Sequence, residues 1–207
     1  MRKPKTIFSF DFKYIDLKSA CNKKMKSSTH KILFLHGLDS SKESSKFQAI
    51  DAKNKVCINV DYRNLNYKTV EQFYCDIIEK IQPAILVGHS LGGYWALKMS
   101  KFFNLPAVIA NPSLAPNFCL DYPAITEDDL DHDIPQFAYI ELGDELLDMH
   151  QTVDQLESFM QVESIAGGHH RLAEPEKLNQ LIEKIEIHYL NTPLNPHPIT
   201  KISKTTQ

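Results

Sequence analysis

The chain has 207 residues, of which 43% are hydrophobic and 24% are charged. This size and composition suit one globular domain with a sizeable core and argue against a disordered or fibrous chain. The net charge of −3 gives no basic field for nucleic acid, and no apolar run approaches the ~20 residues that a membrane span needs.

The first thirty residues differ from the rest. Residues 7–17 (IFSFDFKYIDL) alternate enough to form an added edge strand, and residues 18–30 read as a basic, polar linker. An upstream start to the gene product, with the working domain beginning near Met25, is an equal alternative. Charged residues interrupt the segment before the apolar region of a signal peptide accumulates, so we expect a cytoplasmic protein.

From residue 31 onward, short apolar runs alternate with segments of helical periodicity. This pattern predicts an α/β fold with a mainly parallel sheet flanked by helices. The candidate strands are 31–35, 56–60, 84–87, 107–110, 137–142 and 161–165, and the candidate helices are about 69–81, about 91–103 and a last one marked by Leu178, Leu181, Ile182 and Ile185.

Two polar segments interrupt this alternation. The acidic stretch 112–135 is expected to cross the surface and to form at most a small lid, and the Lys/Ser-rich stretch 40–46 is expected to be a solvated turn and helix start. One domain is predicted over 31–190, and the proline-bearing tail 191–207 is predicted to be disordered.

The pentapeptide Gly88-His89-Ser90-Leu91-Gly92 lies between a predicted strand and a predicted helix. A G-x-S-x-G motif in this context predicts a nucleophile elbow, in which a strained turn projects the Ser90 hydroxyl above the sheet. The alternatives are a plain glycine-rich turn or a phosphate-binding loop, but the lysine of a P-loop is missing. In this geometry the backbone N–H groups of Leu38 and Leu91 would form the oxyanion hole.

An acid must follow a later strand, and the loop after FAYIEL offers three carboxylates. We assign the acid to Asp144, with Asp148 as the alternate, because Asp144 lies beside a glycine at the strand end and Leu146 and Leu147 could anchor the loop in apolar surroundings. Glu145 is interpreted as a solvated charge. The acid would orient the histidine and stabilise its charged form.

The base must be a histidine after the acid, and Gly167-Gly168-His169-His170 follows the last predicted strand. We assign His170, with His169 as the alternate. His36 precedes the serine and is therefore interpreted as a structural residue. The four cysteines show no metal-ligand spacing, and neither a metal nor an organic cofactor is required.

These segments resemble the YqiA-like family of small bacterial esterases in the α/β-hydrolase superfamily. The resemblance runs through LFLHGLDSS (33–41), LVGHSLGGYWALKMS (86–100), LPAVIANPSLAP (105–116), LGDELLD (142–148) and the loop 167–170. It implies the same triad and a nearly lidless esterase for short acyl esters or thioesters. His169 departs from the family, which more often has another residue there, and the first thirty residues have no recognised counterpart.

The expected function is therefore a serine carboxylesterase that works through an acyl-enzyme. An acyl thioesterase with the same triad is one alternative. A non-catalytic α/β-hydrolase-fold binding protein is the other, and it predicts that Ser90 lies beyond hydrogen-bond distance of both histidines. The expected partner is a small acyl ester or thioester.

Overall fold

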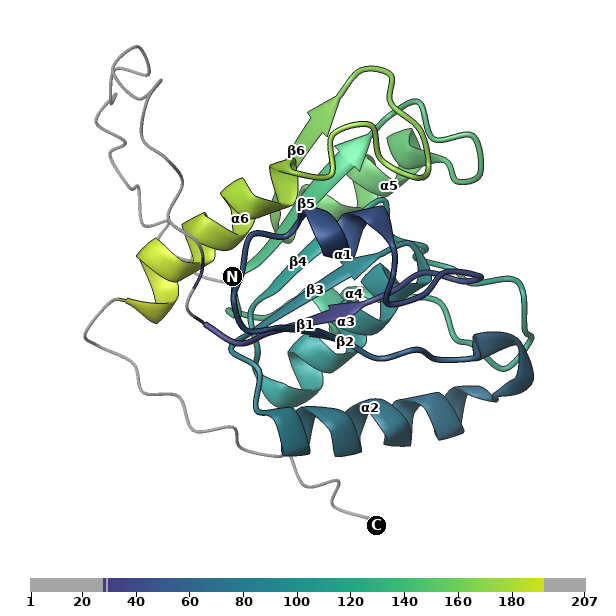
Figure 1. Cartoon of the computed structure of the whole chain (residues 1–207). Coiled ribbons are helices and arrows are strands. Elements are labelled where there is room, and N and C mark those ends of the chain that lie inside the picture. Colours follow the sequence, from purple (N-terminus) through teal and green to yellow (C-terminus); the bar gives the residue numbers. More distant parts are fainter. Residues whose placement is uncertain (1–27, 29, 192–207) are drawn as a thin grey trace, which may run out of the picture.

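In the computed structural model, which describes residues 28 and 30–191, six strands form one sheet with helices on both faces (Figure 1). The strands are β1 (Ile32–Leu35), β2 (Lys55–Cys57), β3 (Ile85–His89), β4 (Ala107–Ala110), β5 (Gln136–Glu141) and β6 (Gln161–Ile165). They all run parallel, in the order β2-β1-β3-β4-β5-β6. The predicted parallel α/β architecture is confirmed, whereas the predicted edge strand at 7–17 and the tail from 192 lie outside the described residues.

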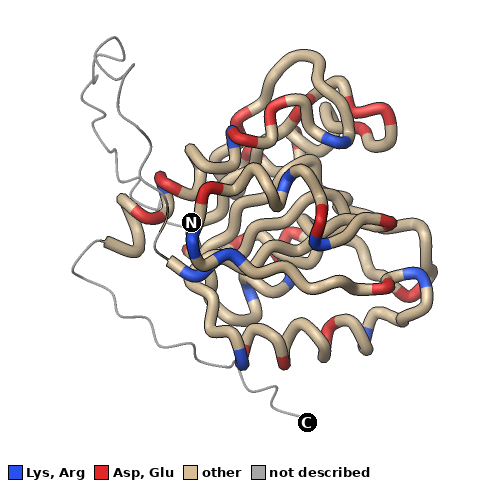
Figure 2. Tube along the Cα trace, viewed as in Figure 1, with Lys and Arg blue, Asp and Glu red and all other residues tan. Residues whose placement is uncertain are grey.

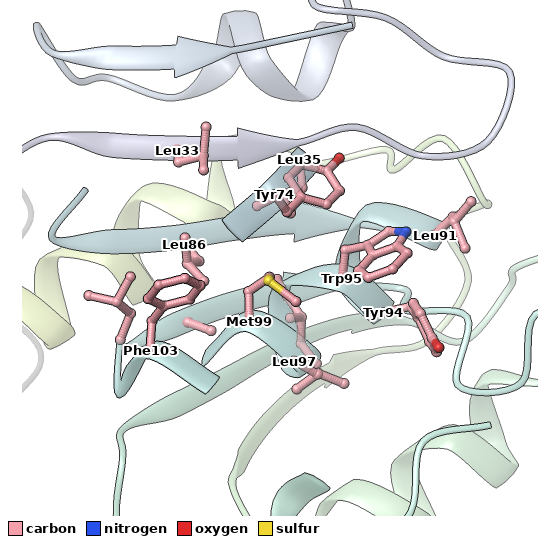
Figure 3. Packing of buried hydrophobic residues seen from close by; sticks show 14 of the residues in the cluster. Leu33, Leu35, Tyr74, Leu86, Leu91, Tyr94, Trp95, Leu97, Met99 and Phe103 are labelled. Carbon is pink, nitrogen blue, oxygen red and sulfur yellow. The ribbon is translucent and has the colours of Figure 1, made fainter. Parts of the chain in front are cut away.

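Both faces of the sheet are apolar and covered, as parallel sheets require. One core forms between alternate strand residues such as Leu33, Leu35 and Leu86 and the helices α2 (Tyr67–Ile81), α3 (Leu91–Phe103) and α5 (Met149–Leu156) (Figure 3). The intervening strand residues, such as Ile32 and Phe34, point to the opposite face of the sheet and pack on the side of α1 (Ser45–Ala49) and α6 (Lys177–Ile185). A single π-helical turn, η2 (Glu186–Leu190), continues α6.

Most element boundaries lie within two residues of the prediction, and two of the differences have clear local reasons. Helix α2 begins two residues early because the Asn66 side chain accepts the Thr69 N–H at 2.9 Å and caps the first turn. Strand β2 ends at Cys57, not at residue 60, because the N–H of Val60 donates to His36 Nε2 at 2.9 Å. That bond turns the chain out of the sheet and into the loop beside β1.

The predicted surface segment 112–135 is anchored to the domain. It carries only the short helix α4 (Glu127–Leu130), and Tyr122 is buried against Trp95 and Tyr94. Within the described residues this segment forms a wall rather than a separate cap. Acidic and basic positions are interspersed along the chain (Figure 2), and no helix in residues 30–191 is long and apolar enough to cross a membrane.

The strand order reverses direction between β1 and β3, and the carboxyl ends of these two strands form a topological switch point. Ligands of open α/β sheets bind in the crevice at such a point. The chain after β1 and the chain after β3 meet closely there, since a Cβ built on Gly37 would lie 3.0 Å from Ser90 Cβ. The fold therefore brings the first glycine loop against the predicted nucleophile.

Candidate active site

Ser90 forms the turn between β3 and α3 with a strained backbone. Its φ is +56° and its ψ is −123°, a region that costs a non-glycine residue about 1–3 kcal/mol. The surroundings hold this conformation, because Ser90 N–H donates to the carbonyl of Ala110 at 3.1 Å and its own carbonyl accepts from Ser113 N–H at 3.1 Å. Gly92 is required beside it, since a Cβ there would lie 1.9 Å from the Leu35 carbonyl oxygen.

Ser90, His170 and Asp144 form one continuous hydrogen-bonded line. His170 Nε2 lies 3.0 Å from Ser90 Oγ, and His170 Nδ1 lies 2.7 Å from Asp144 Oδ2. A carboxylate only accepts hydrogen bonds, so the ring proton belongs on Nδ1 and Nε2 is free to accept the serine hydroxyl hydrogen. The side chain of Asp144 is fully buried, and that of His170 is 13% exposed.

Asp144 follows β5 and is held from several directions. Its Oδ2 accepts from Asn111 Nδ2 at 2.7 Å, and its Oδ1 accepts the backbone N–H groups of Leu146 at 2.8 Å and Leu147 at 3.0 Å. Burial acts to raise the pKa of Asp144, but these donors and His170 together lower it below its ordinary value. The carboxylate is therefore ionised and oriented toward His170 at neutral pH.

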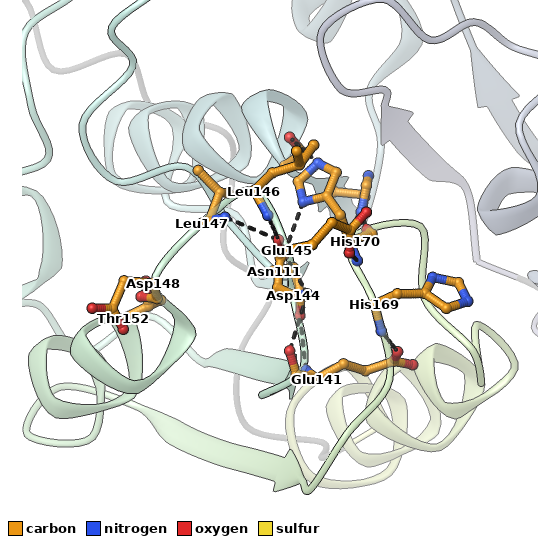
Figure 4. A network of polar contacts seen from close by, with 12 residues as sticks. Asn111, Glu141, Asp144, Glu145, Leu146, Leu147, Asp148, Thr152, His169 and His170 are labelled. Atoms are coloured by element: carbon orange, nitrogen blue, oxygen red, sulfur yellow. Dashed lines mark hydrogen bonds and ion pairs between the residues drawn. The ribbon is translucent and has the colours of Figure 1, made fainter.

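The two alternates occupy other places. Asp148 is the N-cap of α5, where its Oδ1 accepts the Gln151 N–H at 3.0 Å and its carbonyl accepts the Thr152 hydroxyl. The His169 side chain is exposed, and its ring points away from His170 (Figure 4). His169 contributes to the polar contacts of this loop through its backbone, whose N–H donates to Glu141 and whose carbonyl accepts the Leu172 N–H.

The sequence analysis missed Glu141, the last residue of β5. Its carboxylate is completely buried and accepts the N–H groups of His169 at 2.9 Å, Ala173 at 2.8 Å and Glu174 at 3.0 Å, together with the hydroxyl of Tyr139 at 3.0 Å. Burial acts to raise its pKa, but these hydrogen bonds lower it. A glutamate at the end of an apolar strand, two residues before Gly143, was the signal in the sequence for this role.

His89, the residue before Ser90, supports the loop that carries His170 from the other side. Its Nε2 lies 2.6 Å from the carbonyl oxygen of His170 and must donate to it. Burial, reinforced by the charge of Lys46, lowers the pKa of His89 to about 3. His89 is therefore a neutral donor that holds the His170 backbone in place.

The backbone N–H groups of Leu38 and Leu91 have no hydrogen-bond partner in the part of the chain that the structure describes. Both residues line the cleft of about 760 Å³ that contains Ser90, His89 and His170. Unpaired donors at the start of a helix and at a neighbouring loop can stabilise developing negative charge. We refer to this cavity as the Ser90 cleft.

Four neighbouring residues can be compared with the sequence-based interpretation. Leu146 does not anchor its loop in apolar surroundings, because it is 68% exposed and contributes through its N–H, whereas Leu147 packs against the core. Glu145 is exposed but also accepts the His170 N–H at 2.9 Å. His36 is buried, with Nδ1 2.8 Å from the Gly37 carbonyl oxygen, and shapes the first glycine loop.

Comparison with known families gives a match over the middle of the chain. The model of an uncharacterised protein family, UPF0227, the YqiA family, matches residues 31–129 and confirms the predicted resemblance. A UPF0227 protein of Pasteurella multocida is 32% identical over 96 residues, which are 41% of this chain and 52% of that protein, so the match spans about half of the relative. One from Vibrio vulnificus is 26% identical over 155 residues, 63% of this chain and 84% of its own.

Solved structures agree on the fold. An α/β hydrolase enzyme from the metagenome of Mar Chica lagoon sediments, in Morocco, has a TM-score of 0.63 and 18% identity, covering 78% of this chain and 92% of its own. The naproxen esterase of Bacillus subtilis has a TM-score of 0.59 and 12% identity, covering 77% and 84%. The chain therefore has the α/β-hydrolase fold.

Proposed function

Because this chain resembles UPF0227 and has the α/β-hydrolase fold, we propose that it is a serine hydrolase, a carboxylesterase for short-chain acyl esters. The observation that carries the proposal is the line from Ser90 Oγ to His170 Nε2 at 3.0 Å and from His170 Nδ1 to Asp144 Oδ2 at 2.7 Å. A nucleophile, a base and an orienting acid within hydrogen-bond distance are what acyl transfer through a serine needs.

In the proposed mechanism, His170 Nε2 takes the hydroxyl proton while Ser90 Oγ attacks the ester carbonyl. The resulting oxyanion would be stabilised by the N–H groups of Leu38 and Leu91. His170 then returns the proton to the leaving alcohol, and the C–O bond breaks to leave an acyl-enzyme. Water, deprotonated by the same histidine, hydrolyses the acyl-enzyme and regenerates Ser90.

The 3.0 Å contact between Ser90 and His170 argues against the non-catalytic alternative, which requires these groups to be beyond hydrogen-bond distance. The acyl thioesterase alternative uses the same residues and differs only in the leaving group. It is therefore tested as a second substrate series within the same experiment.

The first test measures hydrolysis of 4-nitrophenyl esters of rising acyl length, and of the matched acyl thioesters, by wild type and Ser90→Ala, with a fluorophosphonate label alongside. Turnover and labelling should both be lost in the variant, at a cost of about 10⁴-fold or more in kcat. Folded wild type that neither turns over these substrates nor reacts with the label would contradict the proposal.

The two neighbouring histidines provide a matched control. His170→Ala should lose turnover, and His169→Ala should keep it because its ring is exposed and points away from the site. If the effects were reversed, His169 would be the base, although the serine mechanism would stand.

A further inference from the structure

Lys46 is a buried cation inside the Ser90 cleft. The sequence predicted a solvated stretch at 40–46, but Lys46 on α1 is only 6% exposed. It lines the cavity that also contains Ser90 and His170. A lysine is almost never buried to this degree unless it is paired.

No such partner is present in the described residues, where the Lys46 ammonium makes neither a hydrogen bond nor an ion pair. Other part-buried lysines of the chain are satisfied: Lys55 donates to the carbonyls of Phe47 and Ile50, each at 2.8 Å, and Lys98 pairs with Asp129 at 2.7 Å. A buried charge without a partner is costly. Because the described residues supply no anion to Lys46, a bound ligand could supply it.

The surrounding charges strengthen this conclusion. Arg171 follows His170 and lines the same cleft; it is exposed to solvent and has no ion-pair partner in residues 30–191. Burial first, and then the charge of Arg171, lowers the pKa of Lys46. Arg63 is neutralised by Asp39, and the one remaining acidic residue of the lining, Glu43, is exposed and pairs with neither Lys46 nor Arg171.

The rest of the lining is different in character. Pro116 and Phe118, from the segment after β4, and Leu147, from the loop after β5, give the cleft apolar surface. The cavity thus combines the Ser90-His170-Asp144 hydrogen-bond chain, an apolar lining, the buried unpaired cation Lys46 and the solvent-exposed cation Arg171. A plain alkyl ester would use the first two features and leave the cations without a partner.

We propose that the preferred substrate is an ester that carries a second, anionic group, a carboxylate or a phosphate, which binds Lys46 with help from Arg171. The inference rests on the proposed hydrolase function and specifies the class of substrate for the same site. Charge-assisted hydrogen bonds of this kind are stronger than neutral ones, so the anion should contribute about tenfold or more to kcat/KM.

The test compares matched pairs of esters. Mono-4-nitrophenyl adipate against 4-nitrophenyl hexanoate places the carboxylate on the acyl side, and 4-butyryloxybenzoate against its methyl ester places it on the leaving group. A third pair, 4-butyryloxyphenyl phosphate against the same methyl ester, replaces the carboxylate by phosphate. The kcat/KM of each is measured for wild type, Lys46→Gln and Lys42→Gln, where Lys42 is an exposed lysine of the turn that precedes α1.

Wild type should favour the anionic member of at least one pair. Lys46→Gln should lower that anionic-to-neutral ratio by about tenfold or more, and Lys42→Gln should leave it unchanged. Rescue of the ratio by Lys46→Arg, and its decrease with rising salt, would support a direct contact with the anion.

Equal ratios in wild type and Lys46→Gln for every pair, with neutral esters still cleaved by wild type, would overturn this inference and leave the hydrolase proposal intact. Failure of wild type to cleave any of the esters, charged or neutral, would instead overturn the proposed function. The two failures are therefore distinguishable.

Discussion

The buried carboxylate of Glu141 accepts the backbone N–H of His169 at 2.9 Å and so ties the loop that carries His170 to the end of β5. The same carboxylate accepts the N–H groups of Ala173 and Glu174, which close that loop on its other side. Within the described residues, the hydrogen bonds of the Glu141 carboxylate go to this loop and to Tyr139, and none goes to Ser90. Glu141 acts as a positioning residue, and its effect reaches the site through the backbone.

Replacing Glu141 by Gln should therefore reduce both stability and turnover. The amide presents N–H where the carboxylate presents oxygen, so at least one loop N–H loses its acceptor, at a cost of about 1–3 kcal/mol in the free energy of unfolding. We expect kcat to fall more than KM changes. Urea unfolding and ester kinetics measure the two effects, and the exposed Glu157→Gln is the control. Wild-type kcat in a destabilised Glu141→Gln would show that the role is structural only.

The adjacent glycines of this loop give a matched pair. Both have positive φ, +79° at Gly167 and +76° at Gly168, but a Cβ meets open space at Gly167 and would lie 2.1 Å from Glu141 Oε2 at Gly168. Gly167→Ala should cost about 1–2 kcal/mol of stability from backbone strain alone. Gly168→Ala should cost more and also lower kcat, as measured by thermal unfolding and ester hydrolysis. Equal effects of the two changes would contradict the positioning role of Glu141.

The Asn111 side-chain amide donates a hydrogen bond to the Asp144 carboxylate. Replacing Asn111 by Asp should therefore change the pH dependence of turnover. The variant places a second carboxylate at the position of an amide that lies 2.7 Å from Asp144 Oδ2. Like charges disfavour joint ionisation, so the pKa of the pair rises. The acid limb of kcat/KM should move to higher pH by about one unit or more. Asn111→Ala, which adds no charge, is the control, and an unmoved acid limb in Asn111→Asp would refute this explanation.

Removal of the Asp148 side chain should lower stability, whereas removal of the Asp144 side chain should lower turnover. Asp148→Ala deletes the side-chain cap of α5 and should lower the free energy of unfolding by about 0.5–2 kcal/mol, with kcat/KM unchanged. Asp144→Ala should abolish most turnover. Chemical denaturation and ester kinetics on both variants decide the assignment, and a loss of kcat/KM in Asp148→Ala would return Asp148 to consideration as the acid.

His89 should make the protein sensitive to acid. Its pKa is about 3 in the folded chain, against about 6.5 for an unperturbed histidine. Between these values the unfolded chain binds a proton that the folded chain does not, so stability falls as the pH falls from 6.5 toward 3. The slope from this group approaches about 1.4 kcal/mol per pH unit.

His89→Gln keeps an amide that can donate to the His170 carbonyl but cannot titrate. The free energy of unfolding of this variant, measured by urea denaturation from pH 6.5 to 4, should fall less steeply than that of wild type. His36, whose pKa burial also lowers, is present in both proteins and cancels in the comparison. Parallel curves for the two proteins would show that His89 does not carry this linkage.

The sequence by itself determined the elements and the order of the reactive groups. Apolar runs, a 3.6-residue periodicity over α2 and glycine turns at strand ends are local signals, because they depend on backbone preferences and on burial of one face. Since parallel strands all end at one edge of a sheet, these signals also predicted that Ser90, Asp144 and the two histidines would gather there. The end of β2 and the start of α2 differ from the predicted positions because the side chains of His36 and Asn66 each accept a backbone N–H there.

Only the tertiary structure decided which of two neighbouring side chains faces the serine. His169 and His170 have the same chemistry, and their directions depend on Glu141, 28 residues earlier, and on His89, 81 residues before the carbonyl it contacts. The burial of Lys46 is likewise invisible in a polar stretch of sequence. These features arise from packing between segments that are distant in the chain, and local propensity carries no information about such contacts.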